Sequence, residues 1–295
     1  MSRRLIFIAA ALIFLLILLV FKLSVKEPEK IVENGDLSPT QVLNSAPLQI
    51  IENDLLPLQK ILQAEVAKYK GDVAISVTDL KSLFSAEVGQ DKSFYPASTI
   101  KFLILVGVFK DIEEGKYSFA ETAPLIKSMM SISSNQAANA LIREVGIEKL
   151  SLLPAEIGLY DTLFIHGFED GTKNPLPRLR IGSNAMSTRD ANLFWQKLYR
   201  GELLNKDSTK KALQYSTLPD VKVIYASQGD ALYHKSGYID AVSSEVFHDS
   251  GIVETDNFSY LVSFFSRNNP SHEEGKKFGL RVTKIVYAWF SKKYS

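Results

Sequence analysis

The order of hydrophobic patterns along the chain is the feature that most restricts its fold. A helical spacing of apolar residues over 58–69 precedes two strand-like runs, 73–78 and 83–88. Residues of about 98–213 then show helical patterns without a convincing pair of strands. The remaining elements are three strand-like runs and a final helical pattern, at 231–238, 245–254, 258–265 and 272–292. The sequence therefore predicts the order helix, two strands, helical block, three strands, helix.

This order predicts an α+β fold with a five-stranded antiparallel sheet. Strands from both ends of the pattern can share one sheet, on which the flanking N- and C-terminal helices pack, and the central helices then form an inserted all-α lobe. A site is expected between the sheet and the lobe. At the end of the first helix, Gly71 is expected to adopt a left-handed conformation.

A separate apolar run precedes this globular pattern. Residues 5–21 are uninterrupted by polar side chains and reach the lower limit of length for a membrane span. No small-residue cleavage pattern follows at 22–26, so residues 1–22 are expected to be an uncleaved transmembrane anchor, with a cleaved signal segment as the alternative. Residues 23–49 carry charges, proline and glycine and are expected to be a linker, and 50–295 the folded domain.

Composition and motif content exclude several kinds of chemistry. The chain has no cysteine, which excludes disulfides, thiolate metal sites and a cysteine nucleophile. Its 34 basic and 33 acidic residues give no overall basic field, so no nucleic-acid partner is expected. No dinucleotide, phosphate or metal motif is present, and we expect neither cofactor nor metal. Four scattered histidines are expected to be surface or strand residues: His166, His234, His248 and His272.

One segment, 94–103, concentrates residues suited to nucleophilic catalysis. Ser98 precedes Lys101 by three positions at the start of an apolar helical run, which places both side chains on one helical face. Desolvation and the helix dipole there would lower the pKa of the lysine, and its neutral amine could then accept the serine proton. The alternative is a helix-capping serine followed by a solvated lysine. The spacing alone is weak evidence, because Ser208 and Lys211 share it.

Two later motifs strengthen the catalytic interpretation. Ser133 and Asn135 lie in the helical lobe, where a loop can present a hydroxyl and an amide to a cleft, although a cluster of helix caps is the alternative. Lys235 and Ser236 fall on a predicted strand and are followed by Gly237, which permits close approach of another backbone or a ligand. The alternative there is a strand end with an exposed lysine.

In this order the three motifs resemble the S-x-x-K, S-x-N and K-[ST]-G signatures of serine β-lactamases and penicillin-binding proteins, most closely the class A β-lactamase family. The resemblance covers about residues 54–292 and includes further stretches at 94–99, 135–139, 187–190 and 248–253. It implies a β-lactamase/transpeptidase-like fold and a serine hydrolase that forms an acyl-enzyme with β-lactams or peptidoglycan-type peptides.

The resemblance also implies a role for each matching residue. Ser98 would be the nucleophile and Lys101 its proton acceptor, and Ser133 would relay the proton to the leaving nitrogen. Asn135 would hold both Lys101 and the substrate amide. Lys235 and Ser236 would bind the substrate carboxylate. The main-chain N–H groups of Ser98 and Tyr238 would form the oxyanion hole. The residues expected to bind substrate are thus Asn135, Lys235, Ser236, Gly237 and Tyr238.

The loop that supplies the deacylating base in class A enzymes departs from the family pattern E-x-x-x-N. Glu169 is the candidate catalytic carboxylate here, but Lys173 stands where the asparagine belongs. Asp170 has Asn174 at the right spacing, but its side chain is one methylene shorter. A solvated acidic turn is the alternative role for both carboxylates. The sequence therefore predicts slow deacylation.

Two other departures concern the remaining motifs. Ser134 replaces the usual aspartate of the second motif, and Glu245 stands where the family often places a carboxylate-binding arginine. The second change predicts weak binding of penicillin-type carboxylates. The resulting expectation is a membrane-anchored, extracytoplasmic serine hydrolase of the cell envelope, and the alternative is a catalytically silent binding module of the same fold.

Overall fold

The computed structural model describes residues 53–171, 176, 178–239 and 245–295. The predicted anchor, 1–22, and the predicted linker, 23–49, lie outside the described residues. Among the helices of the described ranges, none is both long and apolar enough to cross a membrane.

Five antiparallel strands form a single sheet in the order β2-β1-β5-β4-β3, which confirms the predicted α+β fold. The strands are β1 (Asp72–Asp79), β2 (Ser85–Val88), β3 (Ala231–Ile239), β4 (Val246–Glu254) and β5 (Ser259–Arg267). The N-terminal hairpin joins the C-terminal strands because β1 pairs with β5, with Ser76 opposite Ser263. Within the described ranges β3 is an edge strand, so its outer backbone groups are open to the helical lobe.

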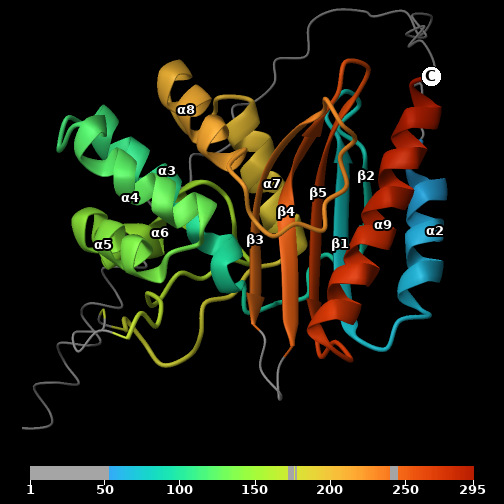
Figure 1. Ribbon diagram of the computed structural model, residues 1–295, viewed down its shortest axis with the longest axis horizontal. Coiled ribbons are helices and arrows are strands. Elements are labelled where there is room, and N and C mark those ends of the chain that lie inside the picture. Colours follow the sequence, from blue (N-terminus) through green and yellow to red (C-terminus); the bar gives the residue numbers. More distant parts are fainter. Residues whose placement is uncertain (1–52, 172–175, 177, 240–244) are drawn as a thin grey trace, which may run out of the picture. The chain divides into compact units, whose positions relative to one another are not determined.

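Two helices, α2 (Leu56–Val66) and α9 (His272–Lys293), pack against one face of the sheet (Figure 1). Leu58 and Leu62, one turn apart on α2, are fully buried in the core that this layer shares with the sheet. The ring of Tyr260 on β5 stacks on that of Phe290 on α9 with centroids 4.5 Å apart. This layer therefore contributes packing to the sheet and leaves the opposite face for the lobe.

The expectation for Gly71 is wrong. Helix α2 ends at Val66, and Gly71 does not have a positive φ. A Cβ at this position would instead lie 2.6 Å from Cε1 of Tyr69 and 3.0 Å from Oδ1 of Asn269. The glycine is thus required by the close packing of a tyrosine and the segment after β5, which a local helix-end pattern does not contain.

The central helices form the predicted lobe on the other face of the sheet. They are α3 (Lys101–Glu113), α4 (Phe119–Ser131), α5 (Asn135–Val145), α6 (Ile147–Glu156), α7 (Thr188–Tyr199) and α8 (Lys206–Ser216). Helix α3 is buried on all sides, because its apolar run is unbroken for two turns. Phe102 on α3 stacks on Phe194 of α7 at 4.0 Å, and Gly107 admits Leu150 of α6, which a Cβ would meet at 2.7 Å. These contacts fix the first residue of α3, Lys101, deep in the molecule.

Candidate active site

Ser98 lies in a short 3₁₀-helix, η1 (Ala97–Ile100), that leads directly into α3. The preceding residue, Ala97, has a φ of 48°, in the left-handed region that non-glycine residues rarely adopt. Ala97 and Thr99 are buried, whereas Ser98 is only half-buried. This strained turn therefore leaves the serine accessible between two buried neighbours.

Lys101 is completely buried, and its ammonium nitrogen contacts the second motif. Nζ donates to the main-chain oxygen of Ser133 at 2.5 Å and to Oδ1 of Asn135 at 2.8 Å, and lies 3.3 Å from Oγ of Ser133. The pKa of Lys101 falls to about 7, chiefly because of burial; the positive charge of Lys235 also lowers it, and the negative charge of Asp220 opposes both effects. The structure thus brings together the lysine and both polar residues of the second motif, with the amine able to be neutral near pH 7.

The second motif is a tight turn between α4 and α5. Ser133 has a φ of 55°, and both its carbonyl and its hydroxyl lie within reach of Lys101. Ser134 is the N-cap of α5, where its Oγ accepts from the N–H of Ala137 at 3.2 Å. Ser134, which replaces the family aspartate, therefore caps α5. The helix-cap alternative for the second motif thus describes this one residue.

The third motif lies on the edge strand β3 against η1. A Cβ on Gly237 would come within 2.6 Å of the nitrogen of Thr99 and 2.8 Å of the oxygen of Pro96, so the close approach predicted here is to another backbone. Lys235 is fully buried, not exposed as in the alternative interpretation. Backbone N–H groups alternate along a strand, so Tyr238 presents its N–H to the same edge of β3 as Ser236.

Sequence reasoning missed Asp220, which lies in the loop before β3. One oxygen of Asp220, Oδ2, accepts from Nζ of Lys235 at 2.5 Å, from Oγ of Ser236 at 2.9 Å and from the N–H of Ser236 at 3.1 Å. Burial raises the pKa of Asp220, but the charge of Lys235 and these hydrogen bonds outweigh it and hold the pKa below its usual value. No motif marks this aspartate, because it is fifteen residues from Lys235 and reaches it only through the tertiary fold.

Glu245, which stands where the family often places an arginine, contacts the segment after β5 through its main chain. Its main-chain oxygen accepts from the backbone N–H of Asn269 at 3.3 Å and from Nδ2 of the same residue at 3.1 Å. Among the described residues, the ion-pair partner of Lys235 is Asp220, and no arginine forms a hydrogen bond with Lys235 or Ser236.

The loop with the candidate carboxylates is fixed by Asn139, a buried residue of α5. Its Oδ1 accepts from the N–H of Phe168 at 2.9 Å, while its Nδ2 donates to the oxygen of Phe168 at 2.6 Å and to Oδ2 of Asp170 at 2.8 Å. As a result the ring of Phe168 lies against Lys101, whose Nζ is 4.6 Å from the ring centroid. The side chain of this loop that faces the lysine is therefore apolar.

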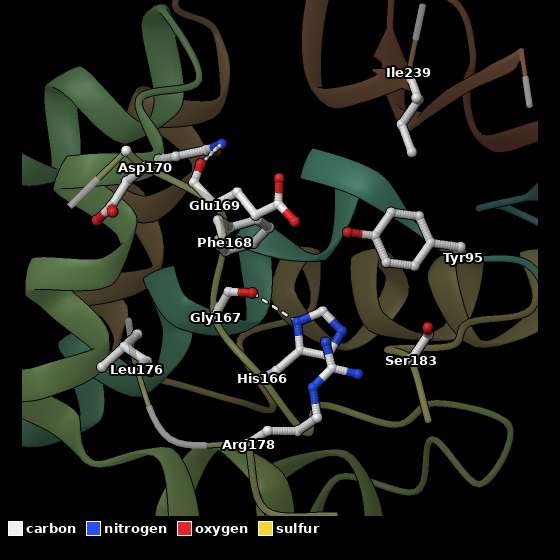
Figure 2. Close-up of a pocket in the computed structure, with 12 residues that line it drawn as sticks. Tyr95, His166, Gly167, Phe168, Glu169, Asp170, Leu176, Arg178, Ser183 and Ile239 are labelled. Atoms are coloured by element: carbon white, nitrogen blue, oxygen red, sulfur yellow. Dashed lines mark hydrogen bonds between the residues drawn. The ribbon is translucent and has the colours of Figure 1, made fainter. Parts of the chain in front are cut away.

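Glu169 is exposed, and no hydrogen bond joins its carboxylate to Lys101 or Ser133 in the described ranges. Its main-chain oxygen accepts from Nδ2 of Asn135 at 2.8 Å. In Figure 2 the carboxylate of Glu169 extends into a pocket of about 890 Å³ toward Tyr95, whereas that of Asp170 points to the opposite side. The catalytic role of Glu169 stays a prediction.

The four histidines and the second S-x-x-K match, Ser208 and Lys211, lie within helices, strands or the pocket wall. His234 on β3 is paired with Asp249 of β4 at 2.8 Å. His248 on β4 is fully buried between Tyr95 and Ser266, and its pKa falls to about 4 because of burial. His166 stacks on Tyr95 in the pocket, and His272 begins α9. Ser208 and Lys211 both lie on α8, where Nζ of Lys211 is 4.5 Å from the ring centroid of Phe119.

Comparison with known proteins agrees with this geometry. The sequence matches the family described as the β-lactamase enzyme family over residues 57–125 and 122–290. The structure of PBP-A is similar, with 27% sequence identity, a TM-score of 0.68, and coverage of 81% of this chain and 97% of that one. A variant of PBP-A, solved as an acyl-enzyme complex with penicillin G, has 27% identity, a TM-score of 0.69 and the same coverage.

A β-lactamase from Sphaerobacter thermophilus shares the fold, with 19% identity, a TM-score of 0.69, and coverage of 81% of this chain and 98% of that one. No curated protein sequence matches the chain. The family match covers most of the chain and includes all three motifs. The chain therefore belongs to the β-lactamase enzyme family and is a β-lactamase-like serine hydrolase.

Proposed function

We propose that this protein forms a long-lived acyl-enzyme on Ser98 with β-lactams or related cell-wall peptide amides. The observation that carries the proposal is the buried Lys101, whose pKa of about 7 makes a neutral amine available one helical turn after an accessible serine. PBP-A, at 27% identity, has a variant solved as an acyl-enzyme with penicillin G, and this supports the same substrate class here.

The acylation step follows from the arrangement of the three motifs. Ser98 Oγ attacks the amide or lactam carbonyl while its proton passes to neutral Lys101, and a carbon–oxygen bond forms. The main-chain N–H groups of Ser98 and Tyr238 stabilise the oxyanion, and each such donor contributes about 3 kcal/mol in acyl transfer. Ser133, 3.3 Å from Nζ of Lys101, then delivers the proton to the nitrogen as the carbon–nitrogen bond breaks.

Slow deacylation is supported by the side chain that faces Lys101. Hydrolysis of the ester needs a base that positions and deprotonates water. The loop places the ring of Phe168 against Lys101, and the carboxylate of Glu169 extends toward Tyr95. Among the described residues, no hydrogen bond joins the carboxylate of Glu169 to Lys101 or Ser133, so we expect penicillin binding rather than rapid β-lactam hydrolysis.

The location we propose is the cell envelope, outside the cytoplasm. It rests on the apolar run at 5–21 and on the substrate class, because cell-wall peptides are extracytoplasmic. The N-terminal helix would hold the enzyme at the membrane, and the linker at 23–49 would give the domain reach.

Intact-protein mass spectrometry with benzylpenicillin tests the function. The wild type should gain the mass of one penicillin, Ser98→Ala should gain none, and Lys101→Ala should react about 10²- to 10⁴-fold more slowly because it lacks the base. Ser208→Ala is the matched control and should label as the wild type does. A wild type that no β-lactam acylates would instead support the catalytically silent binding module.

A further inference from the structure

The anion-binding groups of the third motif already hold an anion, and that anion belongs to the chain itself. Three donors converge on Oδ2 of Asp220: Nζ of Lys235, Oγ of Ser236 and the N–H of Ser236. The resemblance to class A enzymes assigns Lys235 and Ser236 to the substrate carboxylate. The side chain of Lys235 is fully buried, and that of Asp220 is only 7% exposed, so the contact is shielded from water.

The loop that carries Asp220 is anchored to the sheet and to α9. The N–H groups of Val223 and Ile224 donate to Oδ2 of Asp249 on β4, at 2.9 and 3.1 Å. Oγ1 of Thr283 on α9 donates to the oxygen of Val223 at 2.5 Å. Both Val223 and Ile224 are completely buried. Asp220 is therefore only three residues before Val223, which β4 and α9 hold in place. The fold itself thus positions Asp220 against Lys235.

The charges of this subsite disfavour the binding of a second anion. Among the described residues, the ion pair of Asp220 with Lys235 is the only one that either side chain makes. A substrate carboxylate at the same donors would place two anions against one ammonium, or would have to displace Asp220 from three charge-assisted hydrogen bonds. A neutral or cationic group of the substrate meets neither cost.

We propose that Asp220 is a specificity-determining residue that fills the carboxylate subsite, so that the enzyme acylates lactams and acyl amides with a neutral or cationic group at that position. This inference rests on the proposed function and narrows its substrate class. Asp220 occupies the subsite in the free enzyme and contacts the neutral or cationic group beside the leaving nitrogen when substrate is bound.

Benzylpenicillin and its methyl ester, which differ only in the carboxylate, are the probes that test the proposal. The rate of Ser98 acylation is measured for each by intact mass. The wild type should react with the ester at least as fast as with the acid. In Asp220→Asn and Asp220→Ala the acid-to-ester ratio of rates should rise about 10- to 100-fold, the range that hydrogen bonds to charged groups imply. An unchanged ratio in both variants, with Ser98 still acylated, overturns the inference and leaves the proposed function intact.

The matched control is Asp230→Asn. Asp230 lines the same surface pocket as Asp220, but its carboxylate accepts from the N–H of Ser227 at 2.7 Å, and no ion pair joins it to Lys235 within the described ranges. Its ratio of rates should equal that of the wild type. A change as large as in Asp220→Asn would show a general charge effect and contradict the proposal.

Acetate binding provides a readout that does not depend on acylation. Acetate should raise the melting temperature of Asp220→Ala, whose subsite is vacant, and should leave the wild type and Asp230→Asn unchanged. Equal shifts in all three proteins would overturn the inference. If neither penicillin probe acylates any variant, the proposed function fails, and the selective acetate effect still decides whether Asp220 fills an anion site.

Discussion

At the scale of single residues, two buried lysines in one site have opposite surroundings. Lys101 contacts neutral acceptors and the ring of Phe168, whereas Lys235 contacts the carboxylate of Asp220. A buried ammonium without a carboxylate is costly, and this is why the pKa of Lys101 falls. The positive charge of Lys235 near Lys101 favours the neutral amine further. Because Asp220 lies beside Lys235 and not beside Lys101, Lys101 can act as the base and Lys235 as the electrostatic partner.

The rate of acylation should follow the titration of Lys101. Because the neutral amine is the active form and its pKa is about 7, the rate should rise about tenfold per pH unit below 7 and level off above it. Asp220 raises this pKa through its negative charge, so Asp220→Asn should shift the whole profile to lower pH. Stopped-flow acylation between pH 5 and 9 measures both curves. A profile in Asp220→Asn that moves to higher pH would contradict the assignment of Lys101 as base.

Replacing the aromatic ring beside Lys101 by a carboxylate should convert a slow acyl-enzyme into a faster hydrolase. Phe168→Glu keeps the backbone that Asn139 holds and places a base where the ring lies, so deacylation should accelerate about 10²- to 10⁴-fold. Decay of the acyl-enzyme mass measures this rate. Phe168→Leu is the control and should remain slow. Wild-type decay that is fast and depends on Glu169, as shown by Glu169→Gln, would contradict the role assigned to Phe168.

The residues that could be predicted from sequence are those with local signatures. Ser98 and Lys101 share a face because of their spacing, and Gly237 marks a close backbone approach. Asp220 and Phe168 could not be found in this way. Their contacts depend on how two loops are held by Asp249 and Asn139 across the fold, and no short spacing encodes that geometry.

At the scale of elements, the contact between η1 and β3 joins the first and third motifs. Gly237→Ala would place a Cβ 2.6 Å from the backbone nitrogen of Thr99, and relief of this overlap would push the strand away from Ser98. We expect a loss of about 1–3 kcal/mol in unfolding free energy and much slower acylation. Urea unfolding and penicillin labelling measure the two effects.

A control for this variant comes from the turn after α3. Gly115 has a φ of 73°, and a Cβ added there would have no atom within 4 Å, so Gly115→Ala should cost about 1 kcal/mol by backbone strain alone. Its labelling rate should equal that of the wild type. Unimpaired labelling in Gly237→Ala would mean that the close contact of η1 and β3 is not needed for acylation.

Buried His248 makes the junction of η1 with the sheet sensitive to acid. Its Nδ1 accepts from the N–H of Ser266, so Nε2 carries the proton that is donated to the oxygen of Tyr95. Burial lowers its pKa from 6.5 to about 4, so the unfolded chain binds more protons between these values and stability falls as pH decreases through them. We expect about 3 kcal/mol to be lost from this group. Urea unfolding at pH 7 and 4 should show a smaller loss in His248→Gln, and an equal loss in both proteins would refute the assignment.

Helix and strand positions followed from their apolar patterns, but the end of α2 did not. The strands β4 and β5 lie in apolar runs and are almost entirely buried, whereas the buried part of β3, 234–237, is the polar third motif with its glycine. The segment after α2 is shaped by Tyr69, whose ring stacks on Phe278 of α9 at 4.0 Å. That contact spans about two hundred residues of sequence and overrides the local preference of Gly71 for a helix end.

At the scale of the whole molecule, the site lies between the helical lobe and the edge strand of the sheet. One core joins α2 and α9 to one sheet face, and the other fills the helical lobe. The place of the site was predictable, because a lobe inserted between the strands must pack against the same sheet that carries the third motif. The edge position of β3 then determines which motif faces the lobe.

The folded domain should be separable from its proposed anchor. Deletion of residues 1–47 removes none of the described residues and keeps Leu55 and Leu58, which are fully buried in the core. This variant should fold, remain in the soluble fraction and acylate Ser98, whereas the full-length protein should stay in membranes after a high-salt wash because of the apolar run at 5–21. Deletion of residues 1–62 is the control: it also removes these core leucines and should not fold. Recovery of a soluble mature chain that begins near residue 25 would show a cleaved signal segment and overturn the anchor.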